Sequence, residues 1–118
     1  MKDIETEIKK IIAILRSGQP VHPDKLREWH AMLAGEYAFI NSWFSQYEIE
    51  KYEKTREIRN EDGVNSDAQA ERIFFSTDTG KEYLRCKRKL KSLEKMMSSI
   101  KILLEKSQRE YIEINQTS

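Results

Sequence analysis

The stretch "EYLRCKRKLKSLEKMMSSIKILLEKSQREYIEI", residues 82–114, decides the fold. Its apolar positions alternate at spacings of three and four residues over four heptads. Such a repeat places the apolar residues in one stripe along a helix, here called the seam. It predicts packing against another helix with coiled-coil geometry. The predicted seam consists of Tyr83, Cys86, Leu90, Leu93, Met97, Ile100, Leu104, Ser107, Tyr111 and Ile114.

Two helices are expected before this one. Isoleucine and leucine at spacings of four, three and four predict a helix over residues 3–16, with Asp3 as its cap and Gly18 at its end. Pro23 suits a first helical position, and the second helix is expected over residues 23–58.

The last helix is expected over residues 66–114. "SDAQ" at Ser66 and "TGKE" at Thr79 are both typical of a helix cap, and the second, together with Gly80, predicts a kink or short break near residues 76–80. The turn residues in "EDGVNS" join the two long helices, which therefore run antiparallel.

The fold class expected is all-α, a long antiparallel helical hairpin (coiled coil) with a short N-terminal third helix packed at one end. We expect residues 1–118 to form a single helical domain. Along the seam between the two long helices, Ile40, Phe44, Leu90 and Leu93 should be the most buried residues.

Two apolar regions lack cover from the rest of the chain in this arrangement. The last helix outruns its partner beyond about residue 102, and the tip of the hairpin has only two helices. Uncovered apolar surface of this kind favours a protein partner. We expect self-association into a homodimer or higher oligomer, binding to a host or phage protein, or both. The candidate partner surface consists of Leu103, Leu104, Tyr111, Ile112, Ile114, Ile73, Phe74 and Phe75.

The last helix is also strongly basic. Residues 81–95 contain seven basic and two acidic side chains, and several like charges are four residues apart, which costs helix stability unless an anion relieves it. Three interpretations stay open: a solvated face paired with acids of a neighbouring helix, a nucleic-acid surface, or a surface for an acidic protein. No aromatic residues interleave the charges as a stacking platform for single strands would need. The candidate anionic-partner face consists of Lys81, Arg85, Arg88, Lys91 and Lys95.

Other chemistry is weakly represented. The aromatic residues in "WHAMLAGEYAFINSWF" stand at helical spacing and favour a core, although Trp29 or Trp43 at an interface is the alternative. Cys86 is expected to be a small core residue. There is no motif for a catalytic, metal, cofactor or small-molecule site, so we expect no enzyme, no cofactor and no metal.

The composition favours a cytoplasmic protein with no membrane segment. Net charge is +1, and the single cysteine indicates a reducing compartment. The charged N-terminus is unlike a signal peptide, and the longest apolar run, "IIAIL", is far shorter than a membrane span.

Residues 66–105 resemble a class of small helical-hairpin proteins of bacterial phages and prophages. The matching residues are Ala70, Glu71, Arg72, Tyr83, Lys87, Leu90, Leu93 and Ile100. Proteins of this class are often encoded beside replication and recombination functions, and most have no assigned activity. The resemblance therefore implies a phage or prophage setting and transfers no functional residue.

These observations together predict a non-enzymatic interaction or adaptor protein that binds another macromolecule, in phage or prophage DNA metabolism or in interference with a host protein. The alternative is a direct nucleic-acid-binding protein that uses the basic face of the last helix.

Overall fold

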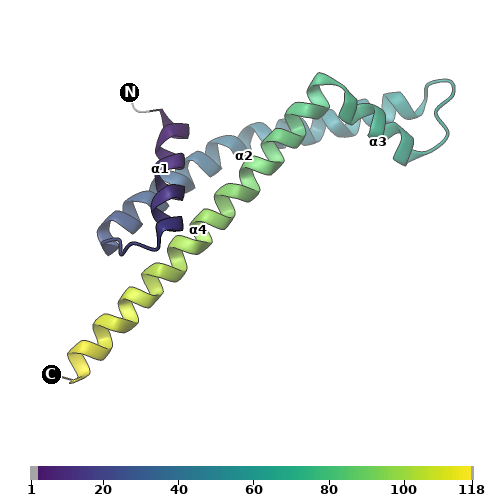
Figure 1. Ribbon diagram of the computed structural model, residues 1–118. Coiled ribbons are helices and arrows are strands. Elements are labelled where there is room, and N and C mark those ends of the chain that lie inside the picture. The colour runs from purple at the N-terminus through teal and green to yellow at the C-terminus, as the bar shows by residue number, and fades with distance from the viewer. Residues whose placement is uncertain (1–2, 118) are drawn as a thin grey trace. The chain divides into compact units, whose positions relative to one another are not determined.

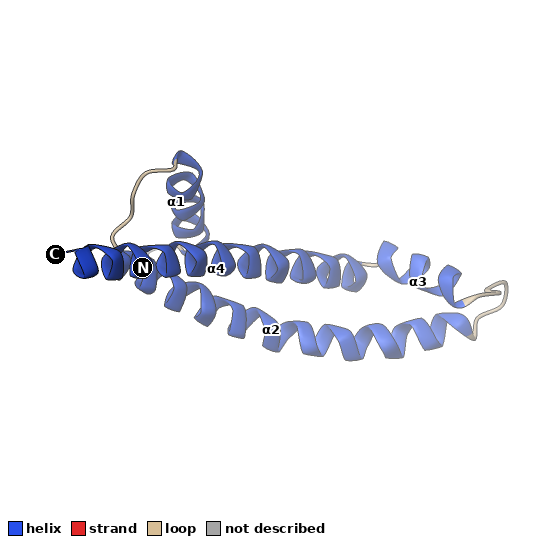
Figure 2. Ribbon diagram, turned by 90° about the horizontal axis from the view of Figure 1, so that it is seen from below, coloured by secondary structure: helices blue, strands red, loops and turns tan. Residues whose placement is uncertain are grey.

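The computed structural model describes the backbone of residues 3–117 and the side chains of residues 3–110. Every regular element in the described backbone is a helix, which confirms the all-α prediction (Figures 1 and 2). The side chains of Tyr111, Ile112 and Ile114, predicted as partner surface, lie outside the described residues. The helices are α1 (Ile4–Ser17), α2 (Pro23–Arg59), α3 (Asp67–Ser76) and α4 (Asp78–Thr117).

The chain divides into two compact units, and the two long helices take part in both. Unit 1 comprises Met1–Gly35 and Glu94–Ser118, and unit 2 comprises Glu36–Leu93. The N-terminal part of α2 and the C-terminal part of α4 therefore belong to unit 1, together with α1. The remainder of α2 and α4 belongs to unit 2, together with α3.

In unit 1 the short helix α1 packs against the parts of α2 and α4 that belong to the same unit. Apolar side chains of all three helices are buried there, among them Ile11 of α1, Leu33 of α2 and Ile100 of α4. Ile11 belongs to the stripe that predicted α1, and Ile100 belongs to the heptad seam. The same seam continues at Leu104, which is half-buried.

The helix ends follow local hydrogen-bonding rules. Asp3 caps α1 by accepting a hydrogen bond from the Glu5 amide at 3.2 Å, and Gly18 ends α1 in the left-handed region at φ 70°. Both ends agree with the prediction. At the start of α2, Nδ1 of His22 accepts a hydrogen bond from the Asp24 amide at 3.1 Å, a capping role that the sequence did not indicate.

In unit 2 the antiparallel parts of α2 and α4 meet along the predicted seam. Phe44 stacks on Tyr83 with 5.1 Å between ring centroids. Ile40, Leu90 and Leu93 are buried as expected, but Phe44 is only half-buried, so its expected place among the most buried residues is wrong.

A short break separates α3 from α4, which is one of the two alternatives predicted for residues 76–80. Thr77 is extended, with ψ 161°, and its hydroxyl accepts a hydrogen bond from the Gly80 amide at 3.1 Å. Thr77 therefore caps α4, and the prediction of a cap at Thr79 is wrong. The other predicted cap is confirmed, because the Ser66 hydroxyl accepts from the Gln69 amide at 3.1 Å.

The helix α3 folds its apolar side onto the core of unit 2. Phe74 is 0% exposed and clusters with Ile58, Ala70 and Tyr83. The expectation that Phe74 lies on a partner surface is therefore wrong. Its neighbour Phe75 is partly buried against the same cluster, and of the three predicted tip residues only Ile73 remains exposed.

A lysine of α2, Lys51, also joins this cluster. The ammonium group of Lys51 lies 5.0 Å from the centroid of the Tyr83 ring and 5.3 Å from that of Phe75. It also pairs with Glu71 of α3 at 3.7 Å. Lys51 follows Ile40, Phe44 and Tyr47 at helical spacing in one stripe of α2, and a cation over aromatic rings explains how a lysine can occupy a position in this apolar stripe.

Candidate interaction surfaces

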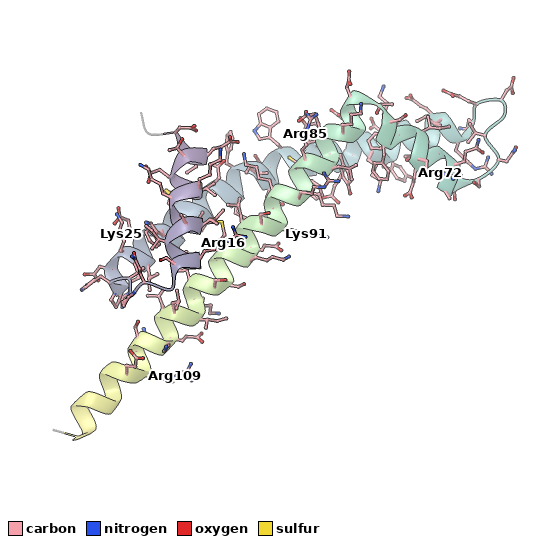
Figure 3. The ribbon with its side chains drawn as sticks, in the orientation of Figure 1. Arg16, Lys25, Arg72, Arg85, Lys91 and Arg109 are labelled. Atoms are coloured by element: carbon pink, nitrogen blue, oxygen red, sulfur yellow. The ribbon has the colours of Figure 1, made fainter. Side chains whose placement is uncertain are left out.

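The predicted basic face is exposed on α4. In unit 2, Lys81, Arg85, Arg88 and Lys91 are all exposed, and Figure 3 labels Arg85 and Lys91 on this part of the helix. In unit 1, Lys95 is exposed as well. All five candidate residues of the anionic-partner face are therefore open to contact.

The exposed cations of unit 2 are poorly neutralised. Residues 78–93 contain six basic and two acidic side chains. Arg85 forms an ion pair with Glu82 of the same helix, whereas Lys81, Arg88 and Lys91 form none within the part of the chain that the structure describes. Pairing with acids of a neighbouring helix therefore does not account for these three charges.

An exposed aromatic pair lies on α2 in the same unit. The Phe39 side chain is 61% exposed and that of Trp43 is 55% exposed. Their ring centroids are 6.5 Å apart with an interplanar angle of 76°, an edge-to-face arrangement. The prediction that these aromatics belong to the core is wrong here, although it is right for Trp29, which is 7% exposed.

The packing places this pair on the same side as part of the basic face. Phe44 and Tyr83 face each other, and the residues preceding them are Trp43 and Glu82. Two antiparallel helices that pack face to face are related by an approximate two-fold axis. The residue that precedes each member of a facing pair therefore lies on the same side of the plane that contains both helix axes. Arg85 lies three residues beyond Glu82, which keeps it on that side.

A second surface is an apolar groove between α1 and α4 in unit 1. Its volume is about 460 Å³. Ile102 is 62% exposed, and Leu103 of the predicted partner surface is exposed beside it. Two exposed cations, Arg16 and Lys95, also line the groove (Figure 3 labels Arg16). The apolar lining consists of Ile12, Leu15, Met96, Ile102 and Leu103.

Neither cation at the groove is neutralised by the chain itself. Arg16 and Lys95 take part in no ion pair among the residues with described side chains. An apolar floor with unpaired positive charge at its rim is suited to a ligand that is apolar in the middle and negatively charged at its edges.

The lone cysteine shows no sign of a reactive thiol. Cys86 is half-buried on the seam, and burial raises the pKa of its thiol above the ordinary value, with the charge of Lys89 acting in the opposite direction. A raised pKa keeps the sulfur protonated and weakly nucleophilic at neutral pH. The thiol therefore fits the predicted packing role.

Another hollow lies between the end of α2 and α3, and its charged side chains are engaged. Arg59 lines it, pairs with Asp67 at 3.2 Å and donates a hydrogen bond to the Val64 carbonyl at 2.9 Å. Among the described residues, no group of His, Cys, Asp and Glu has an arrangement that could hold a metal ion.

No helix in the described range combines the length and apolar character needed to span a bilayer. Comparisons with protein-family models, with curated proteins and with solved structures each find no match.

Proposed function

We propose that this chain is a non-enzymatic interaction protein whose groove between α1 and α4 binds an amphipathic helix of another protein. The observation that carries the proposal is the exposed aliphatic lining of the groove, above all Ile102 at 62% exposure. Contiguous apolar surface that the chain leaves open is typical of a protein-binding site.

The spacing of the lining residues favours a helix as the ligand. Met96, Ser99 and Leu103 of α4 line the groove at spacings of three and four residues, and an amphipathic helix presents its apolar side chains at the same spacings. The groove has no ring of polar groups that would orient a small molecule, since its lining is mainly aliphatic.

The charge at the rim specifies the chemistry of that helix. Arg16 on α1 and Lys95 on α4 both lack a partner in the described part of the chain, so carboxylates flanking the apolar stripe of the ligand would pair with them. Complementary rim charges contribute mainly to specificity and to the rate of association, whereas the aliphatic contacts supply affinity.

Two features of the sequence support a setting for this activity. The resemblance of residues 66–105 to small phage and prophage proteins supports a role in phage or prophage DNA metabolism or in interference with a host protein. The single cysteine supports a reducing, cytoplasmic location.

The test uses two labelled helical peptides with the same apolar stripe, one flanked by glutamates and the other by lysines. Fluorescence anisotropy should show that the glutamate peptide binds the full chain at least about tenfold more tightly, equivalent to about 1.4 kcal/mol. Ile102→Glu should abolish this binding, and the double variant Arg16→Glu, Lys95→Glu should transfer the preference to the lysine peptide. Ile49→Glu is the matched control, because Ile49 is similarly exposed but lies on α2 in unit 2.

Sedimentation of the chain alone gives the competing outcome. If the wild type forms an oligomer that Ile102→Glu dissociates, the groove is occupied by a second copy and the proposal of a separate acidic helix is wrong. Equal binding of both peptides, or binding unaffected by Ile102→Glu, would also refute it.

A further inference from the structure

We propose that unit 2 binds single-stranded nucleic acid where the exposed rings of Phe39 and Trp43 adjoin the basic face of α4. This site differs from the groove of unit 1 in its residues, its ligand and its test. It also differs from the sequence-based alternative, which placed a nucleic-acid surface on the basic residues alone.

The first step concerns the charges. Lys81, Arg88 and Lys91 are exposed and form no ion pair in the described part of the chain. Arg85 stands between Lys81 and Arg88 at spacings of four and three residues, so these side chains form one continuous row on the helix. A row of cations along a rigid rod is suited to a linear polyanion such as a phosphate backbone.

The second step concerns the rings. Exposed aromatic side chains are costly to leave in water, and Phe39 and Trp43 remain more than half exposed in a helix pair that buries other aromatics. Proteins that bind single strands combine a positively charged track with aromatic rings on which bases stack. In this chain the rings come from α2 and the charges come from α4, which is why the sequence of α4 alone did not indicate a stacking platform.

The third step joins the two. The Phe44–Tyr83 contact places Trp43 on the same side of the helix pair as Glu82 and Arg85. A strand whose bases stack on Trp43 can therefore run its backbone towards Arg85 and onward to Arg88. Glu82 neutralises Arg85 within the helix, so the attraction for the backbone comes from Lys81 and Arg88, which form no ion pair in the described residues.

The exposed rings of Phe39 and Trp43 also favour single-stranded nucleic acid over a duplex or an acidic protein as the ligand. Bases in a duplex are stacked on one another and offer no free face to Trp43, whereas single-stranded bases do. An acidic protein would satisfy the cations but would not require a planar partner for the two rings. Single-stranded nucleic acid offers phosphates to the cations and bases to the aromatic rings in one ligand.

Intrinsic fluorescence provides a direct measurement. The chain has two tryptophans, and Trp29 is buried, so quenching by an added strand reports on Trp43. We expect a short oligothymidylate to quench this emission and a duplex of the same length to bind more weakly and without quenching. Trp43→Ala should weaken oligothymidylate binding about fivefold to hundredfold, the range of one stacked base, and Trp43→Phe should retain most of it.

Salt dependence tests the charged part. If Lys81 and Arg88 each contact a phosphate, the logarithm of the binding constant should fall with the logarithm of salt concentration with a slope of about −1.4 for single strands. The double variant Lys81→Glu, Arg88→Glu should reduce both the affinity and this slope. Ile49→Glu is the matched control, because Ile49 is exposed on α2 in the same unit but belongs neither to the aromatic pair nor to the row of cations, and this variant should leave oligothymidylate binding unchanged.

Three outcomes would overturn the proposal. One is equal affinity for duplex and single strand with no effect of Trp43→Ala, which would indicate a basic face without stacking. Another is tighter binding of polyglutamate than of oligothymidylate, which would indicate an acidic protein as the ligand. The third is the absence of oligothymidylate binding by a folded chain at about 50 mM salt, where phosphate contacts are strong.

Discussion

Replacing Gly80 with alanine should destabilise unit 2, although alanine is normally the better helix former. A Cβ atom at this position would lie 2.0 Å from the Phe74 carbonyl oxygen and 2.8 Å from the Cα atom of Phe75. These are backbone atoms of the last turn of α3, so no side-chain rotation can remove the clash. The methyl group can be accommodated only if α3 moves away from α4.

The size of the effect follows from two opposing terms. Alanine in place of glycine within a helix is favourable by about 1 kcal/mol. Overpacking a well-packed core typically costs about 1–3 kcal/mol and occasionally more. The obstructing atoms are backbone and the adjacent Phe74 is fully buried, so the cost should lie at the upper end. The net loss expected in the free energy of unfolding is about 2 kcal/mol.

Urea denaturation followed by far-ultraviolet circular dichroism would measure this loss. Gly35→Ala is the matched control, because Gly35 lies inside α2 and a Cβ atom added there would meet no other atom within 4 Å. That variant should be more stable than wild type by about 0.5–1 kcal/mol. A Gly80→Ala variant as stable as the Gly35→Ala variant would refute the close approach of α3 to α4.

Two other predictions concern the seam. Leu90→Ala should lower the free energy of unfolding by about 2–5 kcal/mol because Leu90 is buried, and a loss below about 0.5 kcal/mol in urea denaturation would mean that the register is wrong. The Cys86 thiol should react slowly with iodoacetamide at neutral pH and faster as the pH rises, because burial raises its pKa and leaves little thiolate. Lys89→Ala should slow the reaction further, since removing the positive charge raises the pKa again, and an unfolded sample provides the reference rate.

Much of the fold could be predicted from spacing alone. The heptad positions Tyr83, Leu90, Leu93 and Ile100 are all buried, because a repeat of three and four keeps one stripe of a helix against its neighbour whatever the details of the partner. The caps at Asp3 and Ser66 could also be predicted, since a capping hydrogen bond spans only two or three residues.

The break before α4 could not be located to the residue in the same way. Thr77 and Thr79 both have a side chain that can cap a helix, and the sequence around Thr79 matches the capping-box pattern better. The choice depends on Gly80, because only a residue without a Cβ atom lets the last turn of α3 approach there. That approach is a tertiary contact, and it is also what buries Phe74.

The exposed aromatic pair was mispredicted for a related reason. Phe39 and Trp43 flank the apolar stripe of α2, and a flanking position is buried only when another helix covers that side. In unit 1 the flank at Trp29 is buried, whereas in unit 2 the flank at Trp43 is open. The residue type is the same in both places, so only the arrangement of the helices distinguishes a core tryptophan from a surface one.

The two proposed surfaces differ in how their affinities should respond to ionic strength, although both combine exposed apolar side chains with unpaired cations. In the groove of unit 1 the aliphatic side chains supply the affinity and two rim charges pair with carboxylates, so binding of the acidic peptide should weaken only modestly with salt. On unit 2 the ligand is a polyanion, and each phosphate contact releases counterions, so the affinity should fall steeply between about 50 and 200 mM salt. Both affinities can be measured on one sample of the chain. A peptide affinity that changes little with salt, beside an oligothymidylate affinity that falls steeply, would mean that two separate sites bind, one mainly through apolar contacts and the other mainly through charge. Parallel salt dependences would instead indicate that charge dominates the binding of both ligands, and the assignment of the groove to an apolar helix would then be wrong.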